Sequence, residues 1–200
     1  MSILDIRPDL VPPDIDSMRE ELAGAYGTYT QTVSPNNMAV SIQTACYFLF
    51  LLRALDAKQA ADFGSGFSSY VLGKYASESS HYVDAVSVDD NDEWMARTGE
   101  FLGSCHLYSE LMSWEHYKHT HFQHDVALYD LANGDVRNAG MELVARRTKS
   151  GGVVLFDDAM HQGHRETMQA VAMKFRWDLY FLTEYTTDQY GRFAALMVKP

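Results

Sequence analysis

Hydrophobic positions recur at helical spacing over the first quarter of the chain. A predicted helix over 14–29 carries Leu22 and Tyr26 on one stripe. A turn signal rich in Ser, Pro and Asn follows it, and a second helix is predicted over 38–55. We expect residues 1–56 to form an N-terminal helical cap on the rest of the chain.

From residue 57 onward, short apolar runs alternate with helical segments. Strands are predicted over 59–63, 82–88, 106–108, 126–129, 153–156, 179–182 and 193–198. Helices are predicted over 67–75, 92–102, 136–148 and 161–175. This alternation indicates a mostly parallel sheet with helices on both faces, and the last two strands should pair antiparallel because no helix separates them. The sequence therefore predicts one α/β domain over 1–200. Its core, 57–200, is a Rossmann-like doubly wound sheet of seven strands with a C-terminal antiparallel hairpin.

The most apolar stretch of the chain, 45–52, lies inside the second predicted helix. It is far shorter than the roughly 20 residues that a membrane span needs. A helix that is apolar all round cannot hide every face against one sheet. We therefore expect a second copy of the chain to cover the remaining face, which makes a homodimer a prediction of this segment.

Charge and cysteine content narrow the classes of partner. The 200 residues contain 16 Lys and Arg against 27 Asp and Glu, a net charge of −11 with a pI near 5.0. A surface that tracks nucleic-acid phosphates, or one that binds anionic membranes, would need clustered Lys and Arg. The two cysteines, Cys46 and Cys105, form no CxxC pair, and the N-terminus does not resemble a signal peptide. We therefore expect a cytoplasmic protein that binds neither nucleic acid nor membranes.

A glycine-rich turn joins the first predicted strand to its helix. Gly64 and Gly66 allow a sharp turn and a close approach to a ligand. Asp89 follows Gly66 by 23 residues, at the end of the second predicted strand, where an acid can accept both hydroxyls of a ribose. The third glycine of a dinucleotide fingerprint is replaced by Ser69, which disfavours a pyrophosphate ligand. A purely structural turn is the alternative.

The chain resembles the class I S-adenosylmethionine-dependent methyltransferases from about residue 38 to residue 200. The resemblance depends on four segments, namely Asp62-Phe-Gly-Ser-Gly-Phe-Ser-Ser69, Val86-Ser-Val-Asp89, Asp125-Val-Ala-Leu-Tyr-Asp130 and Lys149-Ser-Gly-Gly-Val-Val-Leu-Phe-Asp-Asp158. It implies that the glycine-rich turn holds the methionine moiety of the cofactor, that Asp62 lies near its amino group and that Asp89 holds its ribose. The residues expected to bind the cofactor are Asp62, Gly64, Ser65, Gly66, Ser68, Asp89, Asp90 and Asp130.

The expected methyl acceptor is a small molecule. The Asn/Asp-Pro-Pro-aromatic motif of adenine and amide methyltransferases is replaced by Asp130-Leu-Ala-Asn133, and the Pro-Cys nucleophile of cytosine methyltransferases is missing. Carboxylates end the fourth and fifth predicted strands, as in catechol-type and antibiotic-sugar O-methyltransferases. Asp130, Asp157 and Asp158 are therefore candidate ligands for Mg²⁺ or another divalent cation. The alternative is that Asp157 and Asp158 cap a helix or contact the cofactor.

Histidines supply the candidates for proton transfer. His161 follows Asp158 closely and is the candidate general base, with Asp130 as a second catalytic candidate. Arg165, one turn further on, could orient an anionic substrate or be a surface charge. His116 and His119 would share a helix face and could bind a metal, but we favour a polar crossover for this segment.

The leading hypothesis is an S-adenosylmethionine-dependent O-methyltransferase of a small molecule. An NAD-dependent oxidoreductase would also need a glycine turn and a ribose acid. A non-catalytic nucleoside-binding protein of the same fold is the third hypothesis, and an acceptor screen would separate it from the first.

Overall fold

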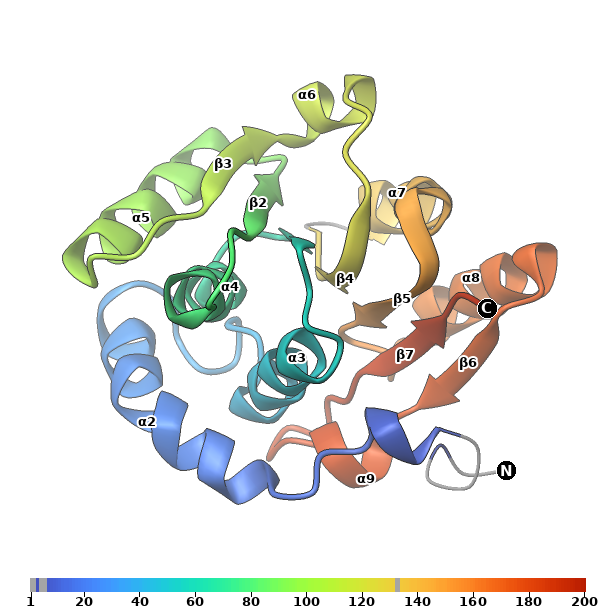
Figure 1. Ribbon diagram of the computed structural model, residues 1–200, viewed down its shortest axis with the longest axis horizontal. Coiled ribbons are helices and arrows are strands. Elements are labelled where there is room, and N and C mark those ends of the chain that lie inside the picture. Colours follow the sequence, from blue (N-terminus) through green and yellow to red (C-terminus); the bar gives the residue numbers. More distant parts are fainter. Residues whose placement is uncertain (1–2, 4–6, 132–133) are drawn as a thin grey trace.

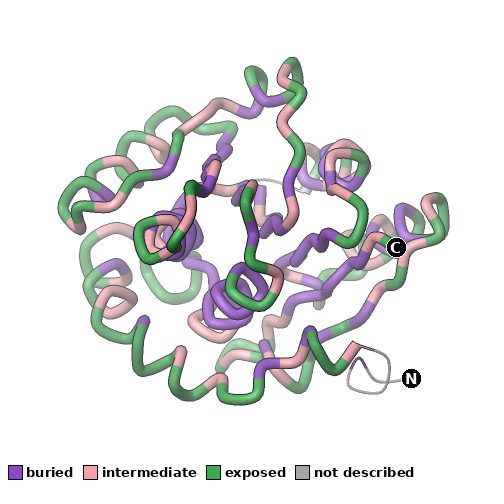
Figure 2. The backbone as a smooth tube through the Cα atoms, viewed as in Figure 1, coloured by how far each residue is buried: buried purple, intermediate pink, exposed green. Residues whose placement is uncertain are grey.

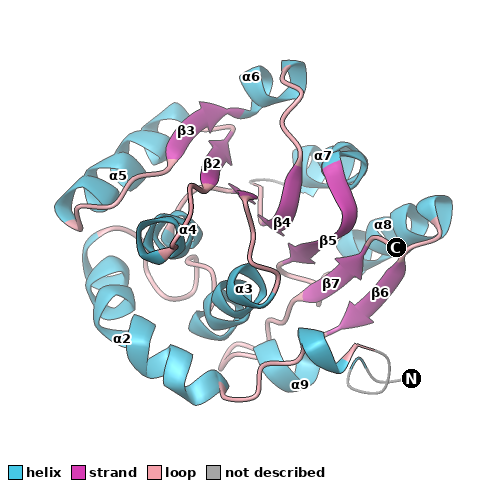
Figure 3. Ribbon diagram, viewed as in Figure 1, coloured by secondary structure: helices cyan, strands magenta, loops and turns pink. Residues whose placement is uncertain are grey.

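A seven-stranded sheet forms the middle layer of the molecule (Figures 1 and 3). The computed structural model describes residues 3, 7–131 and 134–200. The strands are β1 (Gln59–Phe63), β2 (Asp84–Asp89), β3 (Glu110–Ser113), β4 (His124–Tyr129), β5 (Thr148–Phe156), β6 (Asp178–Phe181) and β7 (Ala195–Val198). Their order across the sheet is β3-β2-β1-β4-β5-β7-β6. Strands β1 to β5 pair parallel, whereas β7 pairs antiparallel with both β5 and β6. The predicted fold class is confirmed, although a helix of four residues, α9 (Thr183–Thr186), lies between β6 and β7, where the sequence analysis expected none.

Helices cover both faces of the sheet. One core packs α3 (Ile42–Ala54), α4 (Phe67–Glu78) and α5 (Asp92–Ser104) against one face. The other core packs α6 (Trp114–His119), α7 (Gly134–Arg147) and α8 (Gln162–Phe175) against the opposite face. Alternate strand positions supply the two cores, so that Ala60 belongs to the first and Ala61 to the second.

Helix α3 is covered from every side by the same chain. All residues from Thr44 to Leu52 are buried, as the continuous purple helix in Figure 2 shows. Beyond the sheet, α3 contacts α2 (Ile15–Thr32), α4, α9 (Thr183–Thr186) and the short 3₁₀ helix η1 (Pro8–Leu10). The cover that was expected from a second copy is therefore supplied within one chain. The apolar run no longer argues for a homodimer, which stays an untested prediction.

Helix α2 packs on the same side of the sheet as α3 and α4. Asp14 caps α2 by accepting from the Ser17 N–H at 3.0 Å. Near the end of α2, Tyr29 packs against Phe67 and Phe101, with ring centroids 5.6 and 5.1 Å away. This contact brings the end of α2 to the start of α4, which follows the glycine-rich turn.

The third predicted strand was misplaced, because residues 106–108 include the C-terminal cap of α5. His106 adopts φ 56°, and its N–H bonds to the Gly103 carbonyl while that of Leu107 bonds to the Leu102 carbonyl. This paired pattern is a Schellman motif, which ends a helix and is usually built on glycine. Strand β3 begins only at Glu110. The polar crossover after it contains α6, which the sequence analysis did not predict.

The largest other differences from the predicted boundaries are at the starts of α3 and β5. Helix α3 begins at Ile42 rather than 38, with Ser41 as its cap. Strand β5 begins at Thr148 rather than 153, because Gly151, at φ 77°, accommodates an irregularity in the pairing with β4 without ending the strand. In the described part of the chain, no helix is long and apolar enough to cross a membrane.

Candidate functional site

A cavity of about 700 Å³ opens at the carboxyl ends of the parallel strands. Strand β1 lies between β2 and β4, so the winding of the chain reverses there, which is where open α/β sheets bind their ligands. The predicted site residues that line the cavity are Gly64, Ser65, Gly66, Ser68, Asp89, Asp90, Asp130, Asp157, Asp158 and His161. Asp62 is the predicted site residue that does not line it. The sheet topology therefore brings together carboxylates that are up to 69 residues apart in the chain.

The glycine-rich turn packs directly against the end of β4. Gly64 adopts φ 95°, and a Cβ built there would overlap the carbonyl oxygen of Asp130. The Asp130 N–H donates to the carbonyl of Phe63, which fixes this approach from the other side. A Cβ at Gly66 would lie 2.8 Å from the Tyr29 hydroxyl oxygen. Gly64 is therefore required both by close contact with backbone atoms and by its backbone angle, whereas a side chain at residue 66 would require the Tyr29 hydroxyl to move.

Backbone N–H groups of the turn are bound to acceptors within the protein. Gly64 donates to the Val88 carbonyl at 2.8 Å, Ser65 to Asp89 Oδ2 at 2.7 Å, and Gly66 to Ser69 Oγ at 3.1 Å. A turn that cradles a phosphate needs such groups free to donate to the ligand. The donors of this turn instead hold the ends of β1 and β2 and the start of α4 together.

Asp62 lies beneath the turn and is fully buried. Its carboxylate accepts from the Ser68 hydroxyl at 2.8 Å, from the Ser69 hydroxyl at 2.9 Å, and from Ser87. Burial raises the pKa of Asp62 to about 7, although the three hydroxyl donors favour the ionised form. Its position supports the turn from behind, and its expected contact with the cofactor amino group stays a prediction.

Asp89 ends β2 and is only 4% exposed. Its Oδ2 accepts from both the N–H and the hydroxyl of Ser65, and its Oδ1 accepts from the Asn91 N–H at 2.9 Å. Since a carboxylate has about four lone-pair positions, one on Oδ1 remains for a ligand hydroxyl. Burial raises the pKa of Asp89, and these donors oppose the shift. Asp90, the next residue, is exposed on the cavity wall.

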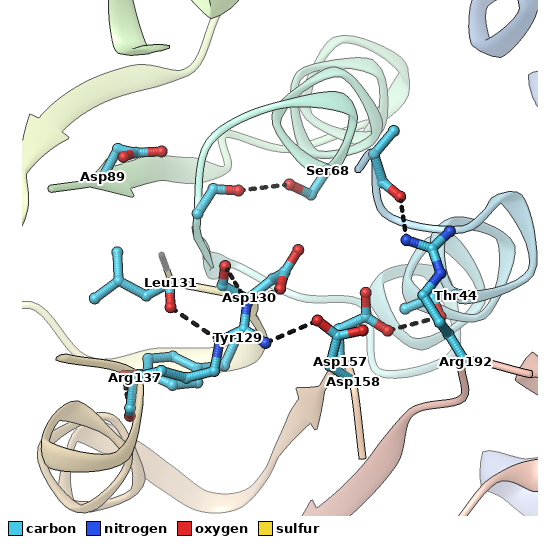
Figure 4. A network of polar contacts seen from close by, with 12 residues as sticks. Thr44, Ser68, Asp89, Tyr129, Asp130, Leu131, Arg137, Asp157, Asp158 and Arg192 are labelled. Atoms are coloured by element: carbon cyan, nitrogen blue, oxygen red, sulfur yellow. Dashed lines mark hydrogen bonds and ion pairs between the residues drawn. The ribbon is translucent and has the colours of Figure 1, made fainter. Parts of the chain in front are cut away.

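A buried arginine joins the strand ends that carry the other carboxylates (Figure 4). Arg137, in the first turns of α7, forms ion pairs with Asp130 and with Asp158 Oδ2, the latter at 3.0 Å. Burial disfavours its charged form, but these carboxylates outweigh that cost and hold the pKa of Arg137 above its ordinary value. Burial raises the pKa of Asp130, and Arg137 is the first cation that opposes the rise. The sequence around Arg137 offered no local signal for this role.

The two carboxylates that follow β5 have different partners. Asp157 is 3% exposed and accepts from Thr44 Oγ1 at 3.3 Å. Burial, together with the neighbouring Asp158, raises the pKa of Asp157 to about 6. Asp158 adopts φ 55°, a left-handed conformation that Asp tolerates better than most residues, and its carboxylate is bound to Arg137. Within the described residues, no group of three or more His, Cys, Asp or Glu side chains could hold a metal ion.

His161 and Arg165, the two candidates predicted at the helix after β5, differ in position: His161 lines the cavity and Arg165 does not. His161 precedes α8 and lines the cavity, exposed, with its ring in edge contact with that of His164. Arg165 donates to the Ala159 carbonyl at 3.2 Å and lies over the rings of Phe181 and Phe193. Arg165 does not line the cavity, so its contacts are those of a residue that supports the C-terminal strands.

The remaining histidines lie away from the cavity. His116 and His119 are exposed on α6. His124 is buried in β4, bonded to Thr148 Oγ1 at 3.0 Å, and burial lowers its pKa to about 3. The crossover interpretation of this segment fits these positions better than a metal site. Ala132 and Asn133, which the sequence analysis quoted after Asp130, lie outside the described residues.

One wall of the cavity comes from the N-terminal segment, which the sequence analysis did not connect with the site. Tyr29 and residues 37–40 line it, opposite the strand ends. Arg192 holds this segment, since it donates to the carbonyls of Asn36 and Ala39 at 3.0 Å and pairs with Asp188 at 2.7 Å. The turn signal at 34–37 was visible in the sequence, but its contact with Arg192 spans more than 150 residues.

Comparisons with known proteins confirm the fold. No family model matches the sequence, and no curated protein matches it. The chain is similar to an O-methyltransferase from Bacillus cereus in complex with S-adenosylhomocysteine, at 16% identity and a TM-score of 0.64, over 98% of this chain and 95% of that one. It is also similar to the O-methyltransferase TomG from Streptomyces achromogenes in complex with S-adenosylmethionine, at 13% identity and a TM-score of 0.62, over 100% and 97% of the two chains. A Podospora anserina methyltransferase bound to S-adenosylhomocysteine matches at 12% identity and a TM-score of 0.65, over 95% and 89%.

These similarities bear out the resemblance that the motifs indicated. The chain shares its Rossmann-like fold with these proteins, and its seven strands form one mostly parallel sheet with antiparallel strands at one edge.

Gly64→Ala tests the close approach of the turn to β4. We expect the variant to lose roughly 2 kcal/mol or more of unfolding free energy, because the new methyl group overlaps the Asp130 carbonyl and φ 95° disfavours an L side chain. Urea denaturation measures the loss. Gly163→Ala is the matched control, since a Cβ there meets nothing within 4 Å. Equal stability of the Gly64 variant and the parent would contradict the contact.

Asp62→Asn tests the buried carboxyl beneath the turn. The folded-state pKa of about 7 exceeds the ordinary 3.8, so the folded chain binds more protons than the unfolded chain between these values. The contribution of Asp62 to stability is therefore complete below pH 4 and is lost as the pH rises through 7. We expect the fall in unfolding free energy between pH 5 and pH 8 to be smaller in Asp62→Asn than in the parent, by at least about 1 kcal/mol. Asp92→Asn, at an exposed position, is the control, and identical pH dependence in parent and Asp62→Asn would contradict the assignment.

Proposed function

We propose that this chain transfers a methyl group from S-adenosylmethionine to an oxygen atom of a small molecule. The observation that carries the proposal is the joint placement of the glycine-rich turn, Asp89 and the strand-end carboxylates on one cavity. Five aspartates line that cavity, against the two guanidinium groups of Arg137 and Arg192. A cofactor with a sulfonium and an ammonium group is attracted to such an acidic site.

The same electrostatics count against an NAD-dependent oxidoreductase. A dinucleotide carries two negative charges on its pyrophosphate, which the aspartates would repel. The N–H groups of Gly64, Ser65 and Gly66 are bound to protein acceptors and are not available to phosphate oxygens. Both observations agree with the absence of the third glycine at Ser69.

The similar structures support oxygen as the acceptor atom. The Bacillus cereus and Streptomyces achromogenes proteins are O-methyltransferases, and they match nearly the whole of this chain. A non-catalytic nucleoside-binding protein of the same fold remains the second candidate, because it would share the turn and Asp89. An acceptor screen separates the two, since only a methyltransferase would turn over.

Methyl transfer requires that an acceptor oxygen be aligned with the methyl group and lose its proton. In our proposal the cofactor lies over residues 64–68 with its ribose at Asp89, and the acceptor lies between the end of β4 and His161. His161 is the general base, since it lines the cavity and is exposed there, one residue before α8. Asp130 contributes to the alignment of the acceptor, because its position at the end of β4 is fixed.

In this proposed reaction no step uses a divalent cation. Asp130 and Asp158, two of the three predicted ligands, are already paired with a guanidinium. A cytoplasmic location and the absence of nucleic-acid and membrane partners remain expectations drawn from composition and sequence, and a homodimer remains an untested expectation.

Calorimetry with S-adenosylmethionine, S-adenosylhomocysteine and NAD tests the cofactor. We expect the first two to bind and NAD not to bind. Asp89→Ala should weaken binding of S-adenosylhomocysteine by tens of fold, because a charge-assisted bond is worth about 2 kcal/mol and the same change releases Ser65. Asp84→Ala, at the opposite end of β2, is the control. If Asp89→Ala binds S-adenosylhomocysteine as tightly as the parent does, the ribose assignment is wrong.

His161→Ala tests the base once an acceptor is identified by screening. We expect kcat to fall by about 10²-fold or more, because a general base acts only in the transition state, while the affinity for S-adenosylhomocysteine stays unchanged. His116→Ala, on the exposed side of α6, controls for loss of a surface histidine. An unchanged kcat in His161→Ala would remove His161 from the mechanism and leave the cofactor site intact.

A further inference from the structure

Arg137 makes contacts on both sides of the gap between β4 and β5. Its Nη2 donates to the carboxylate of Asp130 and, at 3.0 Å, to the carbonyl oxygen of the same residue. Its Nη1 donates to Asp158 Oδ2 at 3.0 Å, and its Nε donates to the Leu131 carbonyl at 2.9 Å. One guanidinium therefore binds four oxygen atoms that follow two neighbouring strands.

Burial and backbone contacts hold Arg137 in this position. Its side chain is 7% exposed, and the Tyr129 hydroxyl donates to the Arg137 carbonyl at 2.8 Å. Figure 4 shows the guanidinium extending from α7 to lie between Leu131 and Asp158. A planar guanidinium with donors in fixed directions is suited to such bridging, whereas a lysine would supply a single point charge. These are the contacts of an ordered component of the site rather than of a mobile surface arginine.

The bridged oxygens belong to the residues that the sequence analysis assigned to a metal. A divalent cation bound by Asp130 and Asp158 would have to approach the same carboxylates as the guanidinium, and the two positive charges would repel each other. The third carboxylate, Asp157, accepts from Thr44 instead and is not bonded to Arg137. The donor set present therefore does not fit a divalent cation while Arg137 occupies it.

We propose that the guanidinium of Arg137 takes the place of a divalent cation in this cavity, so that the site excludes the metal and methyl transfer proceeds without it. The proposal rests on the proposed function only in treating the cavity as the site of transfer. Arg137 is a positioning residue, because its contacts are with the two strand ends and not with a reacting atom.

The absence of a metal from the site determines how the acceptor loses its proton. No metal lowers the pKa of the acceptor hydroxyl, so a side chain must remove the proton during transfer. The acceptor oxygen forms a bond to the methyl carbon as the carbon–sulfur bond breaks, and the electron pair of that bond stays on sulfur. The proton passes to the imidazole of His161. The products are the methyl ether, S-adenosylhomocysteine and a protonated base, and no further reactant is needed.

Mn²⁺ titration followed by electron paramagnetic resonance tests the exclusion of metal directly. The signal of free Mn²⁺ should be unchanged by the parent protein. Arg137→Met, which keeps the bulk of the side chain and removes the charge, should bind Mn²⁺ roughly tenfold more tightly or better than the parent. Adding Asp158→Asn to Arg137→Met should abolish the gain. Arg146→Met, which removes an exposed arginine of the same helix, is the matched control and should behave as the parent does.

Two outcomes of this titration would overturn the proposal. One is stoichiometric uptake of Mn²⁺ by the parent that Asp158→Asn removes, because the metal and Arg137 would then share the site. The other is a folded Arg137→Met that binds no more Mn²⁺ than the parent, because Arg137 would then not be what excludes the cation. Circular dichroism establishes whether the variant is folded.

A chelator experiment on the parent protein decides the question even if Arg137→Met does not fold. EDTA should leave both the affinity for S-adenosylhomocysteine and the rate of methyl transfer unchanged. Loss of turnover with EDTA that Mg²⁺ restores would refute the proposal. Because the Mn²⁺ measurement needs neither cofactor nor acceptor, a failure of the proposed function, such as no binding of S-adenosylmethionine, would be seen separately.

Discussion

The site depends on the approach of the Gly64 backbone to the carbonyl of Asp130. Strands β1 and β4 are neighbours in the sheet. The helix that follows β1, α4, packs on one face of the sheet, and the helix that follows β4, α7, packs on the other face. The Gly64 N–H binds Val88 at the end of β2, and the Asp130 N–H binds Phe63 at the end of β1. Three strand ends are therefore joined by backbone hydrogen bonds at one point. Any side chain at residue 64 would separate them, and the wall of the cavity would open there.

This arrangement explains why much of the site could be predicted. The turn, Asp89 and the strand-end aspartates are local features, because each is recognised from a strand followed by a glycine or an acid. Once the alternating pattern implied a parallel sheet, its geometry brought those strand ends together. The placement of these residues on one cavity could be predicted because residues close in sequence were sufficient to define each feature, and the roles assigned to them stay predictions.

The omission of Arg137 and the unexpected cover of α3 have a common physical origin in contacts between distant residues. Nothing near Arg137 in the sequence indicates that it will bind Asp158, because that contact exists only once β4, α7 and β5 are assembled. The cover of α3 likewise comes from elements at both ends of the chain. The error at 106–108 is different, since His106 takes a backbone angle usually reserved for glycine, and a short apolar segment beside it was interpreted as a strand.

The wall formed by residues 37–40 belongs to a segment that contributes no strand to the sheet. Its position depends on Arg192 and on the end of α2, not on the pairing of β-strands. Substitutions in this segment can therefore change the shape of the cavity without disturbing the contacts at Gly64 or the ion pairs of Arg137. If the proposed function holds, such a division would allow the acceptor to change over evolutionary time while the cofactor site is kept. Descendants of one ancestral chain could then differ most in these few residues and still share one chemistry.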